Sequence, residues 1–153
     1  MNRKSFALVA AALGLATASV MAVAASPANT IAARQANFKV IGKSFKGILD
    51  QMKAPTADFA VIKTSADDLA KAAGKVHGFF PKGTGPEAGV KTHALPAIWE
   101  KPADFKLALA KLVDGTKAMQ KAAKTNDIAQ VKAAFPGVGG ACKGCHDQFK
   151  GKD

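Results

Sequence analysis

Four stretches of this chain repeat apolar residues at spacings of three and four, and this pattern restricts the fold more than any other feature. The stretches cover residues 31–52, 59–80, 105–123 and 128–149. Apolar residues at these spacings line one face of an α-helix. Four helices of this length with heptad-like seams pack lengthwise and interlock their side chains. The sequence therefore predicts an all-α fold, an antiparallel up-down-up-down four-helix bundle.

Local signals predict how two of these helices begin and where one is disturbed. Thr30 is a candidate N-cap for the first helix, and Thr125 or Asn126 for the fourth, because their side-chain oxygens accept hydrogen bonds from unpaired N–H groups. Pro136 lies inside the fourth stretch and has no backbone N–H. We expect a kink there, or a break before Gly137.

The connection between the second and third stretches, residues 81–101, is the longest of the three. It is rich in Gly and Pro, which interrupt helices and favour turns. We expect a loop with some local structure at residues 95–99. Pro102 then suits the first turn of the third helix.

The fourth stretch contains Cys142-Lys143-Gly144-Cys145-His146. C-x-x-C-H is the attachment signal for c-type haem. The thiols form thioether bonds to the haem vinyl groups, and the neutral imidazole binds the iron. On a helix, spacings of three and four place the three side chains on one face. The sequence predicts one covalent haem c, held by Cys142 and Cys145, with His146 as the metal ligand.

Two other kinds of site also use a C-x-x-C pair. Disulfide redox sites accompany a βαβ pattern, and this sequence shows no strand pattern. A zinc site takes about four ligands, and beyond the motif the chain offers only His77 and His93 as further imidazoles. Both cysteines of the chain precede a histidine within one motif, which favours haem over a chance occurrence.

The N-terminus has the organisation of a secretory signal peptide. Two basic residues precede an Ala-rich apolar stretch, residues 6–23, and small residues offer cleavage after Ala24 or Ala25. We expect residues 1–25 to be removed and residues 26–153 to form one exported domain, periplasmic in a Gram-negative bacterium. An uncleaved membrane anchor is the alternative, because the stretch approaches spanning length, but its Ala content and the cleavage site disfavour it.

The chain is basic, with a net charge of +11. Its lysines are spread along the predicted helices with little aromatic interleaving, so we expect no nucleic-acid partner. After signal cleavage we expect no membrane partner either. The basic surface suits an acidic redox protein, or it is simply solvated. The sequence contains no catalytic acid–base constellation, so we do not expect an enzyme.

Arg34 occupies the apolar seam of the first stretch, where an unpaired charge is costly. The guanidinium could extend to the end of the bundle. It could instead form a charge-assisted pair with a haem propionate. The predicted haem favours the second arrangement.

Residues 26–153 resemble class II cytochromes c, and most closely the cytochrome c-prime family. The resemblance is carried by residues 34–38 (RQANF), 94–99 (ALPAIW) and 133–150, which contain the haem motif. The combination of Arg34, Phe38 and Trp99 with C-x-x-C-H is more specific than the motif alone.

The resemblance implies a five-coordinate, high-spin haem whose only protein ligand is His146. It also implies that Phe38 fills the distal side, where low-spin relatives carry a ligating Met. Family members often have Arg four positions after the proximal histidine, and this chain has Lys150. A homodimer through the first two helices is a further implication. The cofactor-binding residues implied besides the two cysteines are Arg34, Gln35, Phe38, Trp99 and Lys150.

Other side chains are poor candidates for a sixth iron ligand. Met52 shares a seam with Phe38 but lies fourteen residues away, which is roughly 21 Å along a helix. We expect Met119 to fill the core, and His77 and His93 to lie at the surface or in loops.

Two functions from different classes follow from these expectations. The first is a gas-binding haem protein, because a vacant iron position behind Phe38 excludes water and large anions but admits nitric oxide or carbon monoxide. The resemblance points to nitric oxide binding or detoxification, and the absence of a distal donor argues against stable oxygen binding. The second is a one-electron carrier between periplasmic redox partners. A third function, a haem store or a structural module, has less support from the sequence.

Overall fold

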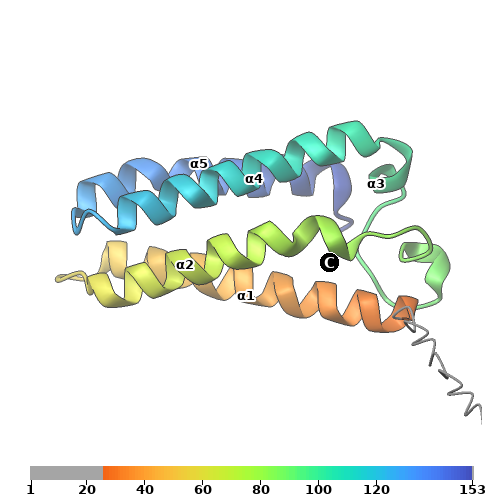
Figure 1. The fold of residues 1–153 in the computed structure, drawn as a ribbon, viewed down its shortest axis with the longest axis horizontal. Coiled ribbons are helices and arrows are strands. Elements are labelled where there is room, and N and C mark those ends of the chain that lie inside the picture. The colour runs from red at the N-terminus through yellow and green to blue at the C-terminus, as the bar shows by residue number, and fades with distance from the viewer. Residues whose placement is uncertain (1–25, 153) are drawn as a thin grey trace, which may run out of the picture.

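The computed structural model describes residues 26–152 as a bundle of four long antiparallel helices, which confirms the predicted fold (Figure 1). The predicted signal peptide, residues 1–25, lies outside the described residues. Within residues 26–152, no helix is long and apolar enough to cross a membrane. The elements in chain order are α1 (Pro27–Lys53), α2 (Phe59–Lys75), the 3₁₀ turns η1 (Val76–Phe79) and η2 (Pro86–Ala88), α3 (Ala97–Glu100), α4 (Pro102–Ala123) and α5 (Ile128–Phe149).

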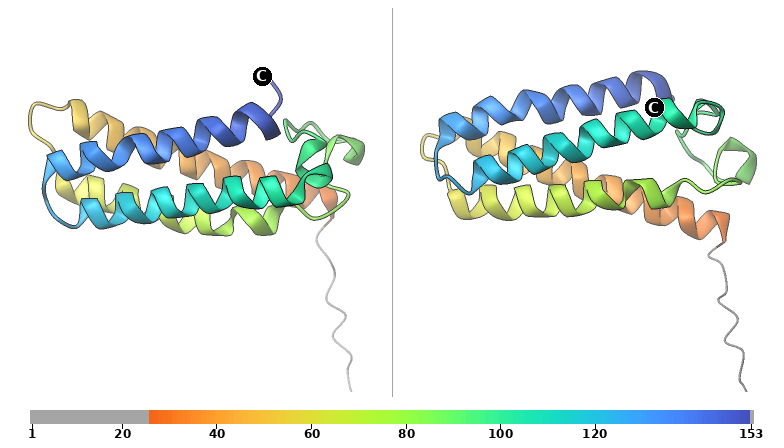
Figure 2. Two further views of the ribbon diagram at one scale, coloured as in Figure 1. Left: turned by 90° about the horizontal axis from the view of Figure 1, so that it is seen from above. Right: turned by 45° about the horizontal axis from the view of Figure 1, so that its top comes forward.

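The long helices form two layers, α1 with α2 and α4 with α5 (Figures 1 and 2). Contacts are extensive within each layer and between α2 and α4, whereas α1 and α5 make few contacts. The long α2–α4 connection, the start of α1 and the end of α5 all lie at one end of the bundle (Figure 2). The fourth side of the bundle, between α1 and α5, is therefore its most loosely packed side.

The core is built from the predicted seams. Each long helix contributes side chains with no exposed surface, such as Ile48 from α1, Leu69 from α2, Met119 from α4 and Val138 from α5. Met119 is thus a core residue, as predicted. Non-directional burial of apolar area favours this arrangement, and the matching periodicities of the four helices align their apolar faces.

The predicted N-caps are wrong by a few residues. Ser26 rather than Thr30 caps α1, and Asp127 caps α5; each side-chain oxygen accepts a hydrogen bond from the first turn. Residues 27–30 are mostly exposed, so the apolar pattern does not report the first turn of α1. Asn126 has a φ of 55°, a left-handed conformation that asparagine adopts more readily than most residues. It turns the chain so that Asp127, and not Thr125 or Asn126, begins the helix.

Two helix boundaries also differ from the prediction. The second stretch is helical to Lys75, after which the backbone tightens into the 3₁₀ turn η1. The fourth shows no break, because α5 continues through Pro136 to Phe149. Pro136 is exposed, which lets water satisfy the carbonyl group that loses its N–H partner. Pro102 starts α4, as predicted, and the predicted local structure at 95–99 includes α3.

Candidate haem site

The last two turns of α5 carry the C-x-x-C-H motif. Cys142 and Cys145 are free thiols, half-buried and packed against the hydrophobic core. His146 is exposed. Lys143 and Asp147, between and after the cysteines, form an exposed ion pair at i, i+4 spacing. The helix therefore turns its two thiols inward and its charged pair outward.

Burial raises the pKa of both thiols. For Cys142 this effect outweighs a backbone hydrogen bond that lowers its pKa. Burial, and secondarily the charge of Cys142, raises the pKa of Cys145 to about 11. A partly buried thiolate is disfavoured because it loses solvation. Both thiols are therefore neutral near pH 7 and compatible with the apolar surroundings.

Arg34 is buried, and its guanidinium reaches the connection that covers the end of the bundle rather than solvent there. Its exposed fraction is 3%. One terminal nitrogen, Nη1, donates to the carbonyl oxygen of Phe79 and to Oγ1 of Thr84, each at 3.3 Å. The other, Nη2, donates to the carbonyl oxygen of Thr84 at 2.9 Å and to Oγ1 of Thr92 at 2.7 Å. Desolvation lowers the pKa of Arg34, but a guanidinium stays charged at any physiological pH.

A row of aromatic rings crosses the bundle from α1 to α5. Phe38, half-buried on α1, meets Phe80 at 6.5 Å between ring centroids. Phe80 meets Phe105 of α4 at 4.9 Å, and Phe105 meets Phe149 of α5 at 5.1 Å. All three contacts are edge-to-face, the arrangement that the quadrupoles of aromatic rings favour. The row links the predicted distal residue with the helix that carries the haem motif.

Trp99 and Gln35 attach the long connection to the bundle. Nε1 of Trp99 donates to the carbonyl oxygens of Phe80 and Pro81, each at 3.2 Å. The indole ring packs so closely on Gly85 that a Cβ there would lie 2.8 Å from it, a contact that only glycine permits. Nε2 of Gln35 donates to the carbonyl oxygen of Lys91 at 3.0 Å. Two of the predicted site residues therefore hold loop backbone in this structure.

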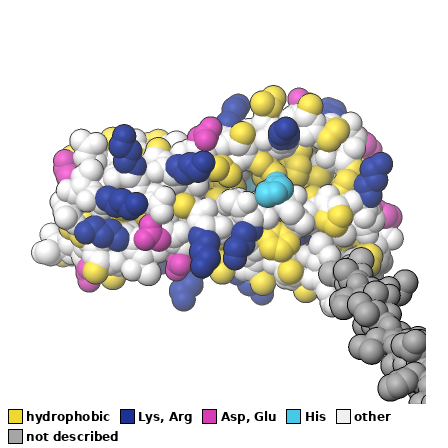
Figure 3. All heavy atoms as spheres, in the orientation of Figure 1, with side chains coloured by type: hydrophobic (Ala, Val, Ile, Leu, Met, Phe, Trp, Pro, Cys, Tyr) yellow, Lys and Arg dark blue, Asp and Glu magenta, His cyan; other side chains and the backbone are white. Residues whose placement is uncertain are grey.

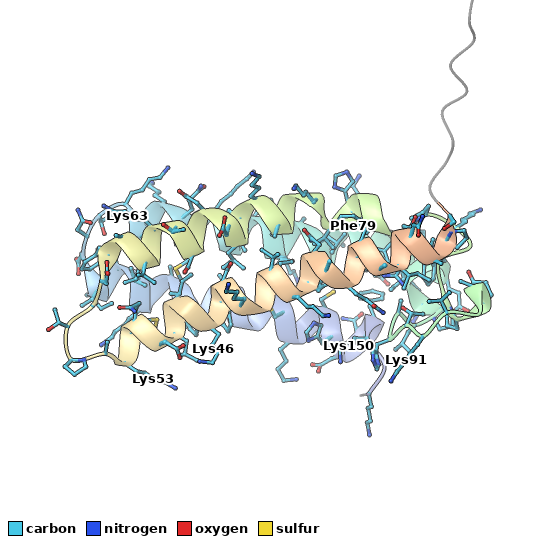
Figure 4. The ribbon with its side chains drawn as sticks, turned by 90° about the horizontal axis from the view of Figure 1, so that it is seen from below. Lys46, Lys53, Lys63, Phe79, Lys91 and Lys150 are labelled. Carbon is cyan, nitrogen blue, oxygen red and sulfur yellow. The ribbon has the colours of Figure 1, made fainter. Side chains whose placement is uncertain are left out.

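Lys150 ends α5 at the same end of the bundle. Its backbone N–H donates to the carbonyl oxygen of His146 at 3.2 Å, and it pairs with Ala94 in an isolated antiparallel bridge. Figure 4 shows Lys150, Lys91 and Phe79 in the half of the bundle that contains the start of α1. The structure thus brings all the predicted site segments to one end of the bundle.

An apolar hollow of about 660 Å³ opens on the α2–α4 face. Phe80, Trp99 and Phe105 line its inner side, and exposed His77 lies among its lining residues. Figure 3 shows apolar side chains gathered around a histidine on this face. Phe80 therefore borders open space and also contacts Phe38.

The comparison with known proteins decides the family. The family described as Cytochrome C' matches residues 29–150. A cytochrome c' of Rubrivivax gelatinosus is 38% identical over 128 residues, which are 82% of this chain and 97% of the relative. This chain belongs to the cytochrome c' family.

Two solved structures of the family share the fold. The nitric oxide complex of a cytochrome c prime mutant from Alcaligenes xylosoxidans is similar with a TM-score of 0.75 and 29% identity, over 84% of this chain and 98% of that one. A cytochrome c' described as having an unusual ligand-controlled dimer dissociation is similar with a TM-score of 0.79 and 26% identity, over 85% of this chain and 100% of that one.

Haem c is the covalent cofactor of a cytochrome c', and the structure fits it. Cys142 and Cys145 supply the two thiols that thioether attachment requires. Both are half-buried and pack against the hydrophobic core. The acceptors that Arg34 reaches are all neutral oxygens. A buried cation with neutral partners is well suited to a further anionic group such as a haem propionate.

Sequence reasoning missed the loop residues that surround Arg34. Thr84 is buried with 2% of its surface exposed, and Thr92 makes the shortest of the hydrogen bonds described for Arg34. Both are threonines in a Gly- and Pro-rich connection, a composition that carries no signal for burial. Phe80 and Phe105 were visible as seam residues, but their edge-to-face contact depends on packing between separate segments.

Proposed function

We propose that this cytochrome c' binds a small diatomic gas, nitric oxide or carbon monoxide, at a five-coordinate, high-spin haem iron whose protein ligand is His146. The observation that carries the proposal is Phe38 on α1, half-buried and edge-on to Phe80. A phenyl ring has no atom that binds iron, so Phe38 at the family's distal position would supply no second protein ligand to the iron. The nitric oxide complex of the Alcaligenes xylosoxidans relative supports the choice of ligand.

Each proposed site residue has a physical role. Haem c, when bound, supplies an iron atom that accepts a ligand on each face. His146 binds the iron through a neutral imidazole nitrogen, and the two cysteines hold the group covalently. Arg34 pairs with a propionate, because charge-assisted hydrogen bonds are strongest where water is excluded. Lys150 places a positive charge near the proximal side.

Phe38 gives the distal side its selectivity. The phenyl ring offers no hydrogen bond to bound water or oxygen, and it occupies space that a larger ligand needs. A diatomic molecule requires only a small displacement of the ring. Gln35 and Trp99 donate hydrogen bonds to the backbone carbonyl oxygens of Lys91 and Phe80. These bonds hold the α2–α4 connection next to Phe38. We infer a binding role rather than catalysis.

Absorption spectra of the ferric and ferrous holoprotein, with and without nitric oxide, test the proposal. We expect high-spin spectra in both oxidation states and a new spectrum on adding the gas. Phe38→Met should convert the iron towards low spin, because a thioether sulfur can bind it. Phe38→Leu is the control, since Leu fills similar space without a ligand atom. A wild-type protein that is low-spin in both oxidation states would refute an open distal site.

Electron transfer is the second candidate function. It is favoured by the basic composition, with a net charge of +11 for the whole chain. A basic surface speeds encounters with an acidic redox protein, and salt weakens this effect. Rapid reduction by an acidic partner that slows steeply with ionic strength, together with no gas-induced spectral change, would favour this function over gas binding.

Location and assembly complete the proposal. The N-terminal signal pattern supports export to the periplasm, and N-terminal sequencing of the mature protein should begin at Ala25 or Ser26. Val40 on α1 and Val61 on α2 are large apolar residues with 44% and 40% of their surface exposed. They support a homodimer formed through α1 and α2. A monomer in sedimentation velocity experiments at tens of micromolar would refute the dimer.

A further inference from the structure

Arg34 ties three separate points of the α2–α4 connection to α1. The points are Phe79 at the end of η1, Thr84 in the following turn, and Thr92 near the return to α3. Thr84 is itself held by a hydrogen bond from its hydroxyl to the carbonyl oxygen of Pro81 at 2.8 Å. A planar guanidinium suits this task because its donors point in fixed and divergent directions.

Phe80 lies within the anchored segment and forms part of the distal surroundings. The Cζ atom of Arg34 lies 4.7 Å from the centroid of the Phe80 ring, within the range of a cation–π contact. The carbonyl oxygen of Phe80 accepts a hydrogen bond from Trp99. The Phe80 ring also contacts Trp99 and Phe105 and borders the apolar hollow. Because part of the ring faces open space, its position also depends on how the backbone is anchored.

We propose that Arg34 is a positioning residue for the distal pocket: by anchoring the connection to α1, it fixes Phe80 against Phe38 and limits the room in which Phe38 moves. The proposal rests on the gas-binding function argued above. It differs from propionate pairing because it acts through Thr84, Thr92 and Phe80. Loosening the anchor lets Phe80 shift towards the hollow and frees Phe38 to move aside when a ligand enters.

Thr92→Val in the holoprotein tests the proposal without changing α1 or any charge. It keeps the shape of the side chain and removes the hydroxyl that accepts a 2.7 Å hydrogen bond from Arg34 and a 3.2 Å hydrogen bond from the backbone N–H of Ala94. Carbon monoxide association with the ferrous protein should be about two- to tenfold faster, the range that corresponds to the loss of one ordinary hydrogen bond, because the other donors of Arg34 still hold part of the connection. Thr64→Val, at an exposed threonine of α2, is the matched control and should leave the rate unchanged.

Arg34→Lys separates anchoring from propionate pairing. Lysine keeps the positive charge but cannot reproduce the divergent donors of arginine. We expect Arg34→Lys to keep a near wild-type reduction potential and to bind carbon monoxide faster, as Thr92→Val does. Arg34→Leu should change both quantities. Amide hydrogen exchange in residues 84–91 should be faster in Thr92→Val than in Thr64→Val, since only the first variant weakens the anchor; residue 94 is left out because its N–H itself donates to Oγ1 of Thr92.

Two results would overturn the proposal: equal carbon monoxide association rates in Thr92→Val and wild type, or a wild-type rate in Arg34→Lys. Either would mean that the anchor does not govern the distal pocket. Failure of the gas-binding function looks different, because the wild-type ferrous protein would then bind no carbon monoxide. If the wild type binds no carbon monoxide, hydrogen exchange alone tests the anchor. Equal exchange in Thr92→Val and Thr64→Val would then show that Arg34 does not anchor the connection.

Discussion

Replacing Phe38 with Ala removes the side chain on which the proposed function depends most. The ring is half-buried, contacts the core and meets Phe80 edge-on at 6.5 Å. Phe38→Ala removes this aromatic contact together with the steric barrier over the distal side. It therefore has two separate consequences, one for stability and one for ligand entry.

The structure sets the size of both consequences. Truncating a fully buried Phe to Ala costs about 3–5 kcal/mol. Because the Phe38 ring is only half-buried, we expect a loss of about 1.5–3 kcal/mol in the free energy of unfolding. If a ligand enters only when the ring leaves its preferred rotamer, at a cost of about 0.5–1.5 kcal/mol, Phe38→Ala should speed association by up to about tenfold.

Stopped-flow mixing of the ferrous holoprotein with carbon monoxide or nitric oxide measures the association rates. Phe59→Ala is the matched control. Phe59 is also a half-buried ring packed against the core, but it starts α2 at the opposite end of the bundle. It should lose comparable stability and keep the wild-type association rates.

Two results would refute the reasoning. Equal association rates in Phe38→Ala and wild type would mean that Phe38 is a core residue and not a gate. Acceleration of similar size in Phe59→Ala would show that general loosening of the bundle, rather than the distal ring, controls ligand entry.

Two further predictions concern the haem attachment and the helix packing. Cys142→Ala combined with Cys145→Ala should lose its haem on extraction with acidified acetone, whereas haem that extracts freely from the wild type would contradict covalent attachment. Gly115→Ala should destabilise the fold by about 1–3 kcal/mol, because the new Cβ would lie 3.2 Å from the carbonyl oxygen of Gly137 across the α4–α5 contact. Gly42→Ala is the control, because nothing lies within 4 Å of the new Cβ on α1, and it should stabilise the fold by up to about 1 kcal/mol. Urea unfolding measures both variants, and equal unfolding midpoints for Gly115→Ala and Gly42→Ala would contradict the close contact at Gly115.

The sequence predicted features that depend on neighbouring positions along the chain. Seams at helical period placed residues such as Leu69 and Met119 in the core, and both are fully buried. The C-x-x-C-H motif is complete within five residues, and the helix alone brings Cys142 and Cys145 to one side. Helix ends were predicted less well. Ser26 and Asp127 cap their helices, and both lie just outside the apolar pattern, which therefore does not locate them.

The surroundings of Arg34 were decided by tertiary structure alone. The sequence indicated that a charge on an apolar seam needs partners, and a haem propionate was the partner that it suggested. The threonines that the side chain contacts lie 50 and 58 residues further along the chain, in a loop without periodicity. The path of the α2–α4 connection over the end of the bundle decides which loop oxygens accept hydrogen bonds from the buried guanidinium of Arg34. No local pattern encodes that path, because it results from the combined packing of Phe80, Trp99 and the helices beneath them.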